Sequence, residues 1–103
     1  MDTIKVGIIQ QSIGTDIECN KEKLAKCIHE VADKGAQLVV LQELHNSPYF
    51  CQVESTENFS YAEPIPGPST DFYSKVAAEC NVVLVTSLFE ARAKGLYHNT
   101  AVV

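Results

Sequence analysis

The chain has 103 residues, 46% of them apolar, which is enough for one small domain with a modest hydrophobic core. Eight basic and thirteen acidic residues give a formal net charge of -5, and no basic cluster favours nucleic acid or an anionic membrane as a partner. No apolar run has the length of a membrane span and the N-terminus does not open a signal peptide, so we expect a soluble, cytoplasmic protein.

The first part of the chain predicts a strand followed by a helix. The apolar segment Ile4–Gln10 has strand character, and Gln11–Glu18 is a polar connection. Apolar residues then recur at helical spacing, with Asn20 expected as the N-cap and Gly35 as the C-terminal stop.

The segment Leu38–Leu44, LVVLQEL, predicts a short strand buried on both faces. Glu43 follows near its carboxyl end, and in α/β sheets ligands bind in the crevice beyond the carboxyl ends of strands. A carboxylate at this place is either a catalytic base or the anchor of a buried hydrogen-bond network. The placement alone leaves both interpretations open.

A long irregular stretch, His45–Pro68, comes next and carries four prolines and four aromatic residues. Loops of this length in a small domain are uncommon and are usually functional, and its aromatic residues indicate that it packs over another element. We then expect a helix capped by Ser69 or Thr70 and ending at Asn81. Its predicted buried face consists of Phe72, Val76 and Cys80.

The last part of the chain predicts two strands, Val82–Phe89 and Leu96–Val103, joined by the polar turn Glu90–Gly95. The order β-α-β-α-β-β implies an α/β fold with a largely parallel sheet, closed by an antiparallel hairpin. Two helices cannot cover both faces of such a sheet, and an apolar strand stands at the end of the chain. We therefore expect residues 1–103 to be the front portion of a longer domain.

The four cysteines, Cys19, Cys27, Cys51 and Cys80, form no C-x-x-C pair, and without a secretory signal a disulfide framework is not expected. Cys27 and Cys80 fall on apolar helical faces and are interpreted as core residues. If Cys51 were a nucleophile, it would need a base within about 3 Å, and no spacing in the sequence indicates such a base.

Histidines offer a second class of function. A carboxylate with two histidines is a known metal-binding set, so Glu43, His45 and His98 make a metal-binding or interaction module the competing hypothesis. Nothing in the sequence places His98 beside the other two, and two ordinary histidines are the simpler interpretation. His29, between Ile28 and Glu30, is expected to be solvated.

Several segments together resemble the N-terminal part of the carbon–nitrogen hydrolase (nitrilase) superfamily. They are KVGIIQ, DKGAQ, LVVLQEL, YFCQ, PIPGPST and LFEARAKGLYHNTAVV, in the family's order. YFCQ and the Tyr97–Thr100 segment YHNT are most similar to N-carbamoylputrescine amidohydrolases, enzymes of polyamine biosynthesis, and then to β-ureidopropionases.

This resemblance implies a four-layer α-β-β-α sandwich, found in homo-oligomers, with a catalytic glutamate, lysine and cysteine. The glutamate position is Glu43, whereas the lysine and cysteine positions fall beyond Val103; neither Lys94 nor Cys51 has the matching context. Residues 1–103 would be an incomplete part of a single domain, inactive alone. The implied substrate is a small N-carbamoyl amine, with no metal or organic cofactor. Tyr49 is a candidate substrate-binding residue of the pocket wall, or simply a packing residue.

Overall fold

The computed structural model describes residues 2–51 and 56–103. Its elements are β1 (Val6–Ile9), α1 (Ile17–Asp33), β2 (Leu38–Leu41), the 3₁₀ helix η1 (Thr56–Tyr61), α2 (Pro68–Cys80), β3 (Val83–Ala93) and β4 (Leu96–Val102). The strands form one sheet in the order β1-β2-β3-β4, in which β1, β2 and β3 are parallel and β4 is antiparallel to β3. The predicted element order and mixed sheet are confirmed.

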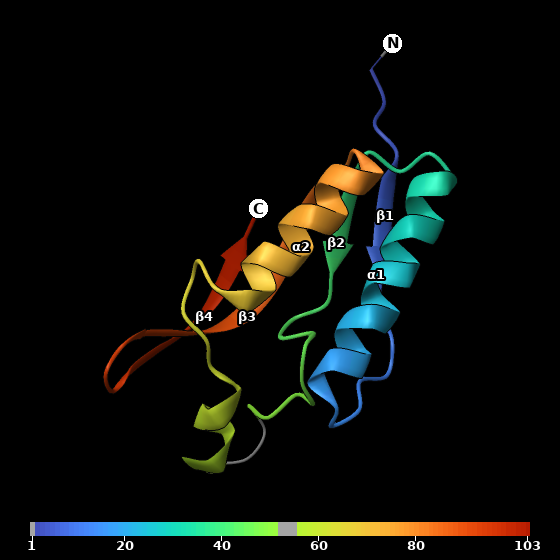
Figure 1. Ribbon diagram of the computed structural model, residues 1–103. Helices are drawn as coiled ribbons and strands as arrows, with labels where there is room; N and C mark the ends of the chain where they lie inside the picture. The colour runs from blue at the N-terminus through green and yellow to red at the C-terminus, as the bar shows by residue number, and fades with distance from the viewer. Residues whose placement is uncertain (1, 52–55) are drawn as a thin grey trace.

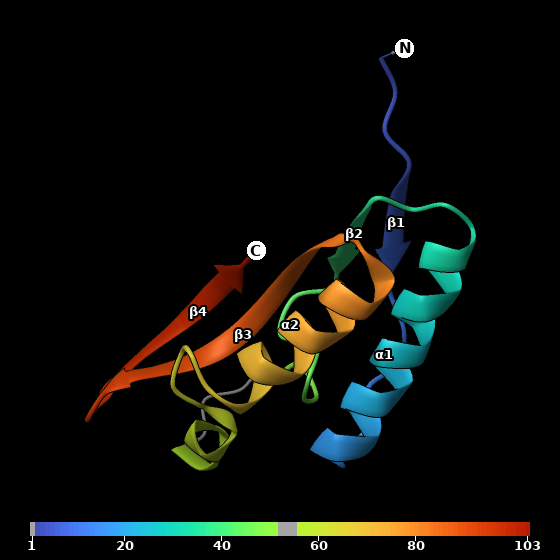
Figure 2. The same ribbon diagram turned by 45° about the horizontal axis from the view of Figure 1, so that its top comes forward.

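Both long helices cover the same face of the sheet, as Figures 1 and 2 show from two directions. The core lies between them and the sheet, where side chains from α1 and α2 pack on alternate residues of the strands. Its buried members are Ile9, Leu24, Ile28, Ala36, Val39, Leu41, Tyr73, Val76 and Leu84. Considered over the described residues, neither helix has the length and apolar character needed to cross a membrane.

The other face of the sheet is apolar and largely open. Ile8 is 76% exposed, and Val6 and Val83 are also exposed. In β2 the burial expected on both faces is found on one: Val39 and Leu41 are buried, while Leu38 and Val40 are half-buried. The reason is that no described element lies across this second face.

Helix α1 begins earlier than expected. Its N-cap is Asp16, whose carboxylate accepts a hydrogen bond from the Cys19 backbone N–H at 3.1 Å, and not Asn20. Asn20 lies inside the first turn and is buried. The expected end is confirmed, because the helix stops at Asp33 and Gly35 adopts a φ of 96°.

Helix α2 also begins before the predicted cap residues. Gly67 is the N-cap and Pro68 the first helical residue, while the Thr70 hydroxyl accepts the Gly67 N–H at 2.7 Å. A Cβ on Gly67 would clash with the Pro64 carbonyl oxygen, so glycine is the residue that fits at this cap. Asn81 ends the helix in the left-handed conformation, as expected.

The inward face of α2 differs in part from the predicted set. Val76 is buried as expected, and Tyr73 is buried beside it. Phe72 and Cys80 are partly buried against the edge of the core. The helix is therefore rotated slightly from the orientation that the fourfold spacing predicts.

The stretch between β2 and α2 contacts the sheet through backbone hydrogen bonds and aromatic packing. Glu63 pairs with β3, donating its N–H to the Phe89 carbonyl at 3.0 Å and accepting the Ala91 N–H at 2.8 Å. Phe50 packs on Phe89 with ring centroids 4.8 Å apart, and Phe59 stacks on Tyr97 at 4.4 Å. This confirms that its aromatic residues pack over another element, here the β3–β4 hairpin, and η1 contributes Phe59 to this packing.

The hairpin is longer than predicted. Strand β3 continues to Ala93, through most of the expected polar turn, and the chain reverses at Lys94 and Gly95, where Gly95 has a φ of 77°. The turn occupies two residues because a glycine supplies the positive φ that such a tight connection requires.

Candidate active site

Glu43 lies two residues beyond the carboxyl end of β2, where the parallel strands present their ligand-binding edge. Its side chain is exposed. The Asn99 side chain, from β4, donates a hydrogen bond from Nδ2 to Glu43 Oε2 at 2.9 Å. The carboxylate therefore stands at the expected place, held by a residue 56 positions along the chain.

Ser87 on β3 connects this pair to the backbone. Its hydroxyl donates to Asn99 Oδ1 at 3.3 Å and accepts the Leu44 backbone N–H at 2.9 Å. Leu44 has a φ of 49° and is buried. The chain therefore turns sharply after Glu43, with the Glu43 side chain bonded to β4 and the next backbone N–H bonded to β3.

Sequence reasoning assigned no role to Asn99 or Ser87. The two-residue turn at Lys94 and Gly95 would by itself place Asn99 opposite Glu90, but a bulge between Ala91 and Ala93 shifts the pairing by one residue, so no simple sequence signal indicated the contact. In that register Ser87 pairs with Ala101 and Phe89 with Asn99. Ser87 and Asn99 are therefore diagonal neighbours on one face of the hairpin.

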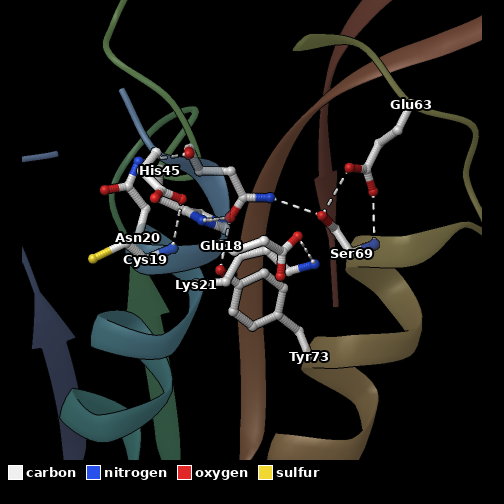
Figure 3. Close-up of polar contacts among 10 residues, drawn as sticks. Glu18, Cys19, Asn20, Lys21, His45, Glu63, Ser69 and Tyr73 are labelled. Atoms are coloured by element: carbon white, nitrogen blue, oxygen red, sulfur yellow. Dashed lines mark hydrogen bonds and ion pairs between the residues drawn. The ribbon is translucent and has the colours of Figure 1, made fainter. Parts of the chain in front are cut away.

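A buried polar cluster supports the chain that follows Glu43 (Figure 3). The Asn46 amide oxygen accepts the Tyr73 hydroxyl at 2.6 Å, and Asn46 Nδ2 donates to the Ser69 hydroxyl at 2.8 Å. His45 Nδ1 lies 2.9 Å from the same Asn46 oxygen. Because that oxygen accepts hydrogen bonds, Nδ1 is the ring nitrogen that carries the proton.

Two further groups close this cluster. The Glu63 carboxylate accepts both the backbone N–H and the hydroxyl of Ser69 (Figure 3). Asn20 donates from Nδ2 to the Asn46 carbonyl at 2.9 Å and to the Gly14 carbonyl at 2.7 Å. Asn20, expected as a helix cap, instead joins the chain after β1 to the chain after β2.

The ionisation of this cluster follows from its burial. Burial lowers the pKa of His45 from 6.5 to about 4, against the smaller opposing effect of its hydrogen bond to Asn46. Burial also raises the pKa of Tyr73. The imidazole is therefore neutral and the phenol protonated at pH 7, which suits a structural scaffold that donates hydrogen bonds.

The structure does not bring the proposed metal ligands together. His45 has no exposed surface and packs edge-on against the Tyr73 ring at 5.1 Å. His98 is adjacent to Asn99 in β4 and so points to the opposite face from the residue that binds Glu43. Across residues 2–51 and 56–103, no three histidine, cysteine, aspartate or glutamate side chains are placed to hold a metal ion.

Tyr49, the other predicted site residue, is 49% exposed. A hydrogen bond with the Cys51 thiol is the main cause that raises the pKa of Tyr49, followed by the negative charges of Cys51 and Glu43. The role of Tyr49 in the pocket wall stays a prediction.

The four cysteines, all in the described part of the chain, are unpaired. Cys27 and Cys80 pack partly buried against the core, as expected. Cys80 also lies 3.3 Å from His29 Nδ1, so His29 has protein contacts in addition to its exposed surface.

Residues 5–103 match the carbon-nitrogen hydrolase family, and the chain belongs to it. The fold agrees: a carbon-nitrogen hydrolase from Helicobacter pylori G27 superposes with a TM-score of 0.88 at 39% identity, over 95% of this chain and 34% of that one.

Curated relatives carry two different activities in their names. An omega-amidase NIT2-B of Xenopus laevis is 38% identical over 104 residues, covering all of this chain and 36% of the relative. An N-carbamoylputrescine amidase of Oryza sativa subsp. japonica is 35% identical over 91 residues, 86% of this chain and 30% of the relative. The chain therefore spans about a third of the length of these relatives.

Proposed function

We propose that residues 1–103 are the N-terminal part of a single amidohydrolase domain and that Glu43 is its general base. The observation that carries this proposal is the Glu43 carboxylate at the carboxyl edge of the sheet, held by Asn99 at 2.9 Å. Membership of the carbon-nitrogen hydrolase family supports it. So does the Xenopus relative, in which the whole of this chain matches 36% of the length. The open apolar face of the sheet, including Ile8 and Val83, is the surface that the remainder of the domain would cover.

The chemistry requires a base of this kind. A thiol becomes a strong nucleophile when a base removes its proton, and its attack on an amide-like carbon creates an oxyanion. Glu43 would accept the thiol proton, transfer it to the departing ammonia, and then deprotonate the water that hydrolyses the thioester. The cysteine and the oxyanion-stabilising lysine implied by the family resemblance would lie outside the 103 residues.

For the substrate, we propose an N-carbamoyl amine, and N-carbamoylputrescine in particular, converted to putrescine, carbon dioxide and ammonia. The YFCQ and YHNT segments and the Oryza relative support this choice. The second candidate is an omega-amide, supported by the Xenopus relative, and a β-ureidopropionase activity is a further alternative. These substrates share a terminal carbonyl bonded to an NH₂ group, so the same attack releases ammonia from each.

The test is ammonia release by the complete protein. It should be offered N-carbamoylputrescine, N-carbamoyl-β-alanine, a dicarboxylic acid with one terminal amide, and an aliphatic nitrile, with kcat/KM compared. The highest kcat/KM for N-carbamoylputrescine would support the proposed substrate. The highest kcat/KM for the terminal amide would show that the protein is an omega-amidase instead. No turnover of any of the four would contradict the proposed function.

The same proposal includes a cytoplasmic location, assembly into a homo-oligomer, and catalysis without a metal or organic cofactor. Four unpaired cysteines are consistent with a reducing compartment. Light scattering and elemental analysis of the complete protein, purified without a histidine tag, test the assembly and the cofactor. Stoichiometric metal that is lost in His45→Ala would instead support the metal-binding alternative.

A further inference from the structure

We infer that Asn99 is a positioning residue that holds the Glu43 carboxylate in the orientation needed for proton transfer, and that Ser87 in turn orients Asn99. This inference rests on the proposed function. Glu43 comes from a loop, is exposed, and has a long side chain that loses rotamer freedom when it is held in one position. A general base must lie within hydrogen-bond reach of the proton that it removes, so an orienting partner improves the rate of the chemical step.

The direction of each hydrogen bond determines how Asn99 is turned. The Leu44 N–H occupies a lone pair of Ser87 Oγ at 2.9 Å, which leaves the Ser87 hydroxyl proton free to be donated. That proton goes to Asn99 Oδ1, so the amide must present its Nδ2 donor on the other side, where Glu43 Oε2 lies at 2.9 Å. The serine thus selects the amide orientation that binds a carboxylate.

These bonds form a closed ring through the peptide that joins Glu43 to Leu44. The Glu43 side chain contacts β4 and the adjoining N–H contacts β3, so the hairpin holds the residue from two sides. After this peptide, the positive φ of Leu44 turns the chain in a new direction. A rigid two-stranded support of this kind orients a loop carboxylate better than the loop could by itself.

A purely structural role makes a different prediction. Asn99 is exposed, and replacing exposed polar residues usually changes stability little. If Asn99 served the fold alone, its loss would leave kcat unchanged. If it orients the base, kcat should fall while KM and the unfolding temperature stay the same.

The experiment uses the complete protein and a substrate that the wild type hydrolyses. We expect Asn99→Ala to lower kcat about 10- to 100-fold, by analogy with the loss of an orienting hydrogen bond to a metal ligand, with KM within about twofold of wild type. Asn99→Asp, which has the same shape but no donor, should show at least the same loss. Ser87→Ala should lower kcat, and Ser87→Thr, which keeps the hydroxyl, should restore it.

The matched control is Thr100→Val on the same strand. Thr100 donates to Glu90 at 2.8 Å on the other face of β4, so its loss removes a similar hydrogen bond away from Glu43 and should leave kcat unchanged. A double-mutant cycle with Glu43→Asp gives a second criterion. If Asn99 acts through Glu43, the loss caused by Asn99→Ala should be much smaller once the carboxylate has been displaced.

Two results overturn the inference and separate it from the proposed function. An active wild type with an Asn99→Ala variant of normal kcat, or with strictly additive effects in the cycle, contradicts the positioning role and leaves the proposed function intact. A wild type that hydrolyses no C–N substrate contradicts both.

Discussion

The Glu63 carboxylate accepts two hydrogen bonds from one residue, the backbone N–H of Ser69 at 2.7 Å and its hydroxyl at 2.9 Å. Ser69 is in the first turn of α2, where backbone N–H groups lack helical partners and a negative charge is favourable. Glu63 is also paired with β3 through its backbone. One residue therefore joins the loop, the helix and the sheet beneath the candidate site.

Glu63→Gln tests this contact. The amide has one acceptor oxygen and no charge, so we expect the free energy of unfolding of the complete protein to fall by about 1–2 kcal/mol in urea titrations. Glu79→Gln is the control, because this exposed residue in the last turn of the same helix has only a half-exposed ion pair with His29 at 3.5 Å, and its loss should change the free energy by less than about 0.5 kcal/mol. Equal effects of the two variants would show that the double hydrogen bond to Ser69 contributes nothing specific.

Glu43→Gln tests the assignment of the base. The amide keeps the shape and removes the proton acceptor, so we expect kcat of the complete enzyme to fall by about 10²- to 10⁴-fold. Because Glu43 is exposed, the unfolding temperature should not change. Near-normal activity, or a variant that fails to fold, would return Glu43 to the role of structural anchor.

His45 makes stability depend on pH in a defined direction. Its pKa is lowered to about 4 in the folded protein, so between that value and 6.5 the unfolded chain binds more protons. The contribution of neutral His45 is complete above pH 6.5 and is lost as the pH falls toward 4, by about 3 kcal/mol. Urea titrations of wild type and His45→Phe across this range measure the difference. Parallel pH profiles would show that His45 is not the group responsible.

Leu44 has a positive φ of 49° and a side chain that is only 4% exposed. The buried side chain stabilises the fold, whereas the backbone conformation is strained for a residue other than glycine. Leu44→Ala should cost about 2–5 kcal/mol because the side chain is removed and the backbone conformation is kept. Leu44→Gly loses the same side chain but relieves about 1 kcal/mol of backbone strain. We therefore expect the glycine variant to be the more stable of the two, the reverse of the usual order. Denaturant titrations decide it, and an alanine variant as stable as the glycine variant would contradict the strain.

The open sheet face predicts the behaviour of the 103 residues expressed alone. Ile8 and Val83 are exposed on an apolar face, so we expect self-association in light scattering and no release of ammonia from the substrates above. Ile8→Lys should reduce the association, because a charge resists burial between sheets. A monodisperse, active 103-residue monomer would contradict both the open face and the incomplete domain.

The amino-acid sequence predicted the elements better than their ends. Apolar runs and helical spacing indicated each strand and both α-helices, since these periods follow from local geometry, but not the short 3₁₀ helix η1 in the stretch expected to be irregular. The ends at Gly35 and Asn81 agree with the structure, but both predicted N-caps were wrong, because several candidate residues are adjacent in the sequence and tertiary contacts decide among them. Asn20 is engaged by the chain after β2, Ser69 by Glu63, and Gly67 caps α2 where no side chain fits.

The sequence by itself determined the strand and helix order and the place of Glu43 at the carboxyl end of β2. Both depend only on local residue patterns and on the direction of the chain. Tertiary structure alone decided that Asn99 binds Glu43, that His45 turns into the core, and that His98 points away. These contacts join residues far apart in the chain. They depend on the register of the hairpin and on how two helices pack over one face of the sheet, and neither is set by local residue patterns.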